Sequence, residues 1–209
     1  MHILNQSWET SNKMKKLLLS VAVTYLATFL IGYILVYIQM PFVMKLFESI
    51  LPALSDSPIY TPIIGALTGG NLVFAIAYTF LVNLSLGAFV STTLPGVIPL
   101  VGGVGSVAVT GIRGFIIGVA YYEVFKISLS YTALGVGTAI LELGAYVFSA
   151  TAGINISLST ISPKRYQVDS RWLAFKMAWK DASRIYVIVI ILLVLGAIWE
   201  MEGLYLLAS

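Results

Sequence analysis

Two ionisable side chains stand inside long apolar stretches of the sequence, where charged groups are rare. Arg113 lies in the stretch from Val97 to Tyr121, and Glu142 lies in the stretch from Tyr131 to Ile161. A charge at membrane depth is costly without a partner or a water-filled cavity, and such residues mark ion, proton or substrate routes. With about 1.5 Å of rise per helical residue, the two side chains differ in depth by about a turn. We therefore predict a buried ion pair between them, serving either as a structural contact or as part of such a route.

Neutral polar residues recur at helical spacing beside these two charges. Thr110 precedes Arg113 by about one turn, and Asn83 lies in another apolar stretch among small and polar side chains. Hydroxyl and amide groups form hydrogen bonds between helices in lipid. The sequence therefore predicts an intramembrane polar site formed by Asn83, Thr110, Arg113 and Glu142.

Small residues form stripes on the same stretches. Gly114 and Gly118 make a GxxxG pattern, and Ala145, Ser149 and Gly153 recur every four residues. Small side chains let helix backbones approach closely in lipid. We interpret both stripes as helix-packing surfaces.

The residues that most enzymes and metal sites require are missing from the apolar stretches. The chain has no cysteine and its only histidine is His2, which excludes thiol nucleophiles and a histidine metal cluster. Gly102, Gly103 and Gly105 form a glycine-rich run, but no P-loop lysine follows it. We expect no catalytic residue, no metal and no cofactor, and hence a protein that is not an enzyme. A lipid-active enzyme is a further alternative.

The composition identifies lipid as the solvent that most side chains meet. Of the 209 residues, 59% are hydrophobic and 10% are charged. Soluble domains have about 45–50% apolar and about 25% charged residues. A crossing helix needs about 20 largely apolar residues, and we assign five spans, at roughly 17–38, 71–94, 97–121, 131–161 and 185–199. The sequence predicts one membrane domain over 1–209, an all-α polytopic membrane helix bundle.

Two segments between the spans have a different character. The outer loop at 40–70 contains four prolines, so it cannot form one straight helix, although Pro41 to Leu51 fits a short amphipathic helix. The segment 162–184 alternates aromatic and basic residues at helical spacing, with Asp169 or Ser170 as a suitable N-cap. It predicts either a cytoplasmic amphipathic helix in the membrane interface or a continuous extension of the fifth span.

The distribution of basic residues predicts the orientation of the spans. If the N-terminus is cytoplasmic, nine of the twelve lysines and arginines fall on the cytoplasmic side, in agreement with the positive-inside rule. Glu200 and Glu202 then lie at the outer end of the fifth span. The net charge of +3 therefore indicates membrane topology, and we expect no nucleic-acid partner. The nine residues are Lys13, Lys15, Lys16, Lys164, Arg165, Arg171, Lys176, Lys180 and Arg184.

Five motifs along the chain are similar to those of a known family. Phe29 to Tyr37 (FLIGYILVY) is an apolar run with an embedded glycine, and Asn83 is a polar residue in the second span. Ile112 to Gly118 (IRGFIIG) keeps the glycines of an NGxxxG pattern. Leu141 to Ile156 (LELGAYVFSATAGINI) is a glutamate-containing helix, and Leu195 to Glu200 (LGAIWE) resembles a closing AxxIE pattern. Over most of the chain, these motifs resemble the stage II sporulation protein M family.

The resemblance implies a function but includes departures from the family pattern. Thr138 and Ala139 stand where the family often has His-Gly, and Arg113 stands where it has asparagine. The resemblance implies a membrane scaffold or assembly protein of a prokaryotic plasma membrane. Its expected partners are membrane lipid, further copies of itself as a homo-oligomer, and other membrane or envelope proteins.

A transporter or permease subunit is the alternative to the scaffold. It is motivated by the polar residues Asn83, Arg113 and Glu142, and by the glycine-rich third span, which could unwind to bind a ligand. This alternative predicts a polar cavity around the three residues, whereas a dry and fully packed bundle would contradict it.

Overall fold

All regular secondary structure in the computed structural model, which describes residues 2–55 and 57–208, is helical. Within these residues, five helices are long and apolar enough to cross a membrane. The prediction of an all-α fold with about five helices long and apolar enough to cross a membrane is confirmed. The five spans are Lys15–Tyr37 (α2), Leu72–Val97, Val101–Ile127 (α6), Leu129–Ile161 and Arg171–Leu207, the last within α9 (Arg171–Ala208).

The second and fourth spans each contain a π-helical segment. The second consists of α5 (Leu72–Val82), the π-helix η1 (Asn83–Thr93) and the 3₁₀-helix η2 (Leu94–Val97). The fourth consists of α7 (Leu129–Thr138), the π-helical η3 (Ala139–Leu143) and α8 (Gly144–Ile161). The third span, α6, is one continuous helix despite its glycines, so the expected unwinding is not observed there. The irregular helix lies instead in the spans that carry Asn83 and Glu142.

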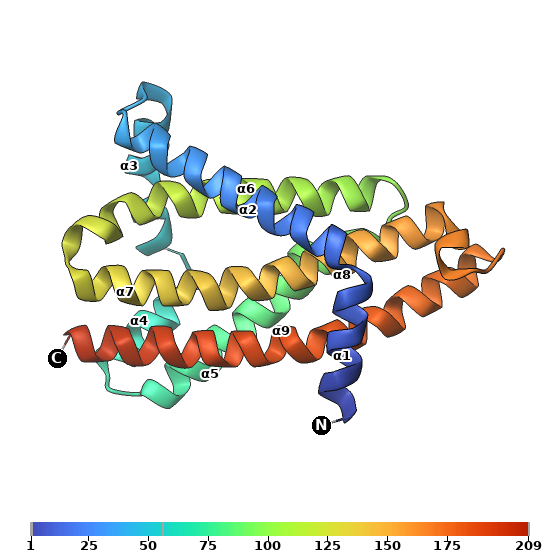
Figure 1. The fold of residues 1–209 in the computed structure, drawn as a ribbon. Coiled ribbons are helices and arrows are strands. Elements are labelled where there is room, and N and C mark those ends of the chain that lie inside the picture. The colour runs from blue at the N-terminus through green and yellow to red at the C-terminus, as the bar shows by residue number, and fades with distance from the viewer. Residues whose placement is uncertain (1, 56, 209) are drawn as a thin grey trace.

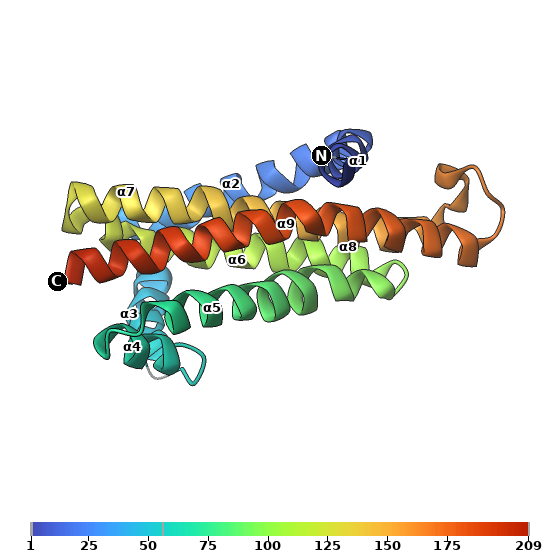
Figure 2. The same ribbon diagram turned by 90° about the horizontal axis from the view of Figure 1, so that it is seen from below.

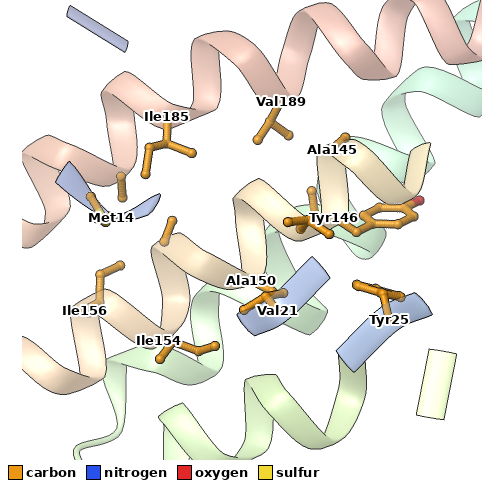
Figure 3. Close-up of a cluster of buried hydrophobic side chains, with 14 of the residues drawn as sticks. Met14, Val21, Tyr25, Ala145, Tyr146, Ala150, Ile154, Ile156, Ile185 and Val189 are labelled. Carbon is orange, nitrogen blue, oxygen red and sulfur yellow. The ribbon is translucent and has the colours of Figure 1, made fainter. Parts of the chain in front are cut away.

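The spans lie side by side, and α8 is the most enclosed of their segments (Figure 1, Figure 2). Of its 18 residues, 13 are buried, because α8 contacts α2, α6, α9 and the second span. Figure 3 shows side chains of α2, α8 and α9 meeting in one apolar cluster. Its labelled members are Met14, Val21, Tyr25, Ala145, Tyr146, Ala150, Ile154, Ile156, Ile185 and Val189.

Glycines bring the first and third spans into close contact. A Cβ atom at Gly118 would collide with the backbone carbonyl of Phe29, and one at Gly114 would collide with the Thr28 hydroxyl. The approach is reciprocal, because a Cβ at Gly32 would collide with the carbonyl of Phe115. The GxxxG pattern therefore packs α6 against α2 within one chain.

The second stripe of small residues packs the fourth span against the second. Ala145, Ser149 and Gly153 are all buried. A Cβ at Gly153 would meet the backbone of Thr92 and Thr93, so no larger side chain fits at this contact. Both predicted packing stripes thus lie against other helices of the same chain.

The ends of several spans differ from the predicted ranges. Two prolines interrupt the backbone hydrogen bonds around Leu94–Val97, and Leu100 has a φ of 64°, so the third span begins at Val101 rather than Val97. The fifth helix begins at Arg171, where Ser170 Oγ accepts a hydrogen bond from the Leu173 N–H (3.3 Å). The part of the predicted amphipathic segment from Arg171 onward therefore continues the fifth span, the second of the two alternatives. Only a short 3₁₀ turn, η4 (Pro163–Tyr166), precedes it.

Among the described residues, three further α-helices lie outside the five spans. The outer loop contains α3 (Pro41–Ser55), which extends the predicted short helix, and α4 (Thr61–Thr68). The N-terminal helix α1 (His2–Lys13) packs across α9 (Figure 1). The start of α2 lies toward the end of the bundle where α8 meets α9, whereas α3 and the α6–α7 turn lie at the other end (Figure 1). The basic residues assigned to the cytoplasm therefore gather toward one end.

Substitution of Gly118 tests the contact between α2 and α6. We expect Gly118→Ala to lower the free energy of unfolding by about 1–3 kcal/mol, because the added methyl group overpacks a backbone contact. Gly111→Ala is the matched control on the same helix, since its Cβ would meet Thr28 Cγ2 at an ordinary 3.6 Å. Unfolding of both variants in detergent is followed by tryptophan fluorescence, and equal stabilities would contradict the assigned packing.

Candidate functional site

Three of the predicted polar residues lie near the middle of their spans. Asn83 is residue 12 of 26 in the second span, Arg113 is residue 13 of 27 in the third, and Glu142 is residue 14 of 33 in the fourth. Residues at the middle of a crossing helix lie near the centre of the hydrocarbon core, where water is scarce. Each of these groups therefore needs a partner within the protein or a hydrated cavity.

Glu142 is held by Asn83. Asn83 Nδ2 donates a hydrogen bond of 2.6 Å to Glu142 Oε1, and it links the second span to the fourth. Both residues lie in π-helical segments, η1 and η3. Such segments are rare and are frequent at functional sites, because the extra residue in the turn re-aims the side chains.

Arg113 makes its contacts with the second span and with Tyr146. Its Nη1 donates to the carbonyl of Gly87 (3.1 Å), its Nη2 donates to Ser91 Oγ (2.8 Å), and its Cζ lies 4.2 Å from the Tyr146 ring centroid. An aromatic face attracts a cation through its quadrupole. Three neutral groups therefore stabilise the guanidinium.

The predicted ion pair between Arg113 and Glu142 is wrong. Over the described part of the chain, the salt bridges join Lys126 to Glu123 and Arg184 to Asp181, and neither involves this pair. The physical reason is that acceptors on the second span bind Arg113, while Asn83 on the same span binds the glutamate. A comparison of depths along two helices could not show that a third helix would supply partners to both.

Several of these side chains line a cavity of about 930 Å³. This volume falls in the range of about 300–1,000 Å³ that is typical of small-molecule sites. Asn83, Arg113 and Glu142 line the cavity, but Thr110 does not. Thr110 is buried elsewhere, and its hydroxyl donates to the Ser106 carbonyl of its own helix (2.7 Å). Three of the four predicted site residues thus come together.

Several residues of the cavity wall were not predicted as site residues. Glu200 was placed at the outer end of the fifth span, but α9 continues to Ala208, so its carboxylate lines the cavity. The sequence offered one signal for Glu200, because it is an acidic residue that directly follows an apolar run. The hydroxyls of Thr79 and Thr138 also line the cavity, and neither has a hydrogen-bond partner. A signal was present for both, since Thr79 lies one helical turn before Asn83 and Thr138 stands at a position where the resembled family often has a polar residue.

Tyr60 brings a phenol into the same cavity from outside the spans. It directly precedes α4 and is one of the lining residues. Burial raises the pKa of the Tyr60 hydroxyl, the carboxylates of Glu200 and Glu142 raise it further, and Arg113 lowers it. Tyr60 thus lines the same cavity as Arg113, Glu142 and Glu200.

A polar layer of hydrogen-bonded side chains joins three of the spans. Thr93 Oγ1 donates to the Ser149 carbonyl (2.9 Å) and lies 2.8 Å from the Tyr186 hydroxyl. Thr92 Oγ1 lies 2.8 Å from Ser149 Oγ. These groups come from the second, fourth and fifth spans, at the end where α8 meets α9. None of these four residues lines the cavity.

The side chains around the cavity can bind a ligand through charge and hydrogen bonds. The described residues contain no cluster of three or more histidine, cysteine, aspartate or glutamate residues that could hold a metal ion. The cavity offers one guanidinium, two carboxylates and several hydroxyls. These groups recognise charge and hydrogen-bonding pattern in a ligand. The chain matches no protein-family model, no curated protein and no solved structure.

A double-mutant cycle tests the link between Asn83 and Glu142. We expect Asn83→Ala and Glu142→Ala to be coupled by about 1–2 kcal/mol in the free energy of unfolding, because each variant leaves the other group unpaired. Ser85→Ala replaces Asn83→Ala in the control cycle, since the Ser85 hydroxyl bonds only the Leu81 carbonyl of its own helix. Unfolding in mixed micelles provides the energies, and additive effects of the first pair would contradict the hydrogen bond.

Proposed function

We propose that this chain is a multi-pass membrane transport protein that binds a small polar or charged solute in the cavity between its spans. The observation that carries the proposal is the grouping of Asn83, Arg113, Glu142 and Glu200 around one cavity of about 930 Å³. Charged groups at membrane depth are costly, and a route for a solute is a common reason for keeping them. A fully packed bundle around these residues would have opposed the proposal.

The two stripes of small residues add no support to the scaffold hypothesis. The stripes at Gly114 and Gly118, and at Ala145, Ser149 and Gly153, are used for contacts within the chain. They therefore give no reason to expect a second copy. The resemblance to the stage II sporulation protein M family stays a prediction, and it would be compatible with a transport subunit of a larger assembly.

We further propose that the N-terminus is cytoplasmic. Nine of the twelve basic residues of the chain then face the cytoplasm, as the positive-inside rule requires. In this orientation the polar layer around Thr93 and Ser149 lies on the cytoplasmic side of the cavity, and α4 lies on the outer side. The structure would then represent a conformation closed toward the cytoplasm, and transport would require this layer to open.

Chemical labelling of introduced cysteines tests the proposal. Because the chain has no native cysteine, only the introduced thiol can react. Thr138→Cys places a thiol in the cavity wall, and Ile140→Cys, at a residue 68% exposed on the same span, places one toward lipid. We expect the cavity thiol to react more than about tenfold faster, because only a hydrated thiol ionises. Both the cationic reagent MTSET and the anionic reagent MTSES are used, so that hydration is judged independently of charge.

The side of reaction distinguishes transport from a static site. The reagents are added to right-side-out and to inside-out vesicles, and a transport protein should react from both sides, more slowly from the cytoplasmic side. Reaction from one side only would indicate a binding site without transport. Equal, slow reaction of the two thiols would show a dry cavity and would overturn the proposal.

A further inference from the structure

The cavity is lined by two acidic side chains and one basic side chain. Arg113 has two hydrogen bonds and an aromatic face of its own, so its charge is already stabilised by the protein. Glu142 has one donor, Asn83, and Glu200 has neither a hydrogen-bond donor nor a basic partner among the described residues. Two carboxylates therefore share the cavity with a single guanidinium. The group that would complete this set is a cation.

Two buried hydroxyls indicate independently that the cavity is built for a ligand. Thr79 is 4% exposed and Thr138 is 6% exposed, and both hydroxyls lack a partner while lining the cavity. A buried hydroxyl without a hydrogen bond is costly, and native structures keep few of them. Water or a bound ligand would supply the missing partner.

One side of the cavity is apolar and faces outward between the second and third spans. Leu86, Ile112 and Ile116 line the cavity while being 46%, 61% and 39% exposed at the surface of the bundle. The helices α5 and α6 separate from each other toward α4 (Figure 2). In a membrane, this side meets acyl chains. A ligand that reaches the carboxylates from here must itself be partly apolar.

These observations rest on the proposed function and define its substrate class. We propose that the cavity binds an amphiphilic organic cation, with the positive charge at Glu200 and Glu142 and the apolar part between the second and third spans. Tyr60 and Tyr121, which also line the cavity, add aromatic rings suited to a diffuse positive charge. Glu200 is the main counter-ion, because one carboxyl oxygen of Glu142 already accepts a hydrogen bond from Asn83.

A pair of ions with the same shape and opposite charge tests this proposal. Tetraphenylphosphonium and tetraphenylborate are titrated separately into the purified chain in detergent, with protein-free micelles as the blank, and heat is measured. We expect saturable binding of the phosphonium only. Glu200→Gln should weaken this binding about tenfold or more, because it removes a charged partner from a desolvated site. Glu202→Gln, two residues further along α9 on an exposed side chain, should change it less than about twofold.

The outcomes separate this inference from the proposed function. Equal binding of both ions, or equal effects of Glu200→Gln and Glu202→Gln, would show partition into apolar surface only and would overturn the inference. Absence of phosphonium binding would also overturn it. If the cavity thiol still reacted from both sides of the membrane in either case, the transport proposal would stand with a different substrate class. Choline, a hydrophilic cation, should compete poorly, and strong competition would contradict the apolar entrance.

Discussion

The hydrogen bonds of Arg113 to the second span hold its guanidinium without an ion pair to Glu142. A guanidinium near the middle of a crossing helix would ordinarily bind the nearest carboxylate, because few other charged partners exist in lipid. Here the Gly87 carbonyl, Ser91 and the Tyr146 ring take that place. As a result, neither Glu142 nor Glu200 forms an ion pair with Arg113. Both carboxyl groups line the cavity.

Close helix packing in other parts of the molecule holds the bundle together around this cavity. The first and third spans meet through Gly32, Gly114 and Gly118, and the fourth meets the second through Gly153. In lipid, helices gain no hydrophobic free energy by associating, so such backbone contacts and the hydrogen bonds around Ser149 provide the cohesion. The bundle is tight at the end where α8 meets α9 and looser around the cavity.

The π-helical segments connect the local geometry to the site. Each places one residue of the Asn83–Glu142 pair, and each lies in a span that lines the cavity. A π-helical turn weakens the regular pattern of backbone hydrogen bonds, and a protein keeps it where the position of a side chain matters more than helix stability. The glycine-rich third span needed no such irregularity, because its glycines serve helix contact.

The sequence by itself determined the all-helical class, the approximate places of five candidate spans and three of the residues that line the cavity. Apolar runs and the rarity of charges depend only on composition and helix length, so they can be read without coordinates. Asn83, Arg113 and Glu142 were identifiable because a polar group in an apolar run is conspicuous. The two small-residue stripes were equally plain as packing surfaces, although the sequence could not say which helix each would meet.

Only the tertiary structure decided which groups are partners. Arg113 binds the second span, and Thr110 lies away from the cavity. Glu200 and Tyr60 line the cavity. All of these placements depend on helix rotation and tilt. These quantities are set by contacts between distant parts of the chain, such as the fit of Gly153 against Thr92. Periodicity along one helix records which side is polar, but it carries no information about the side chains that the other helices bring to meet it.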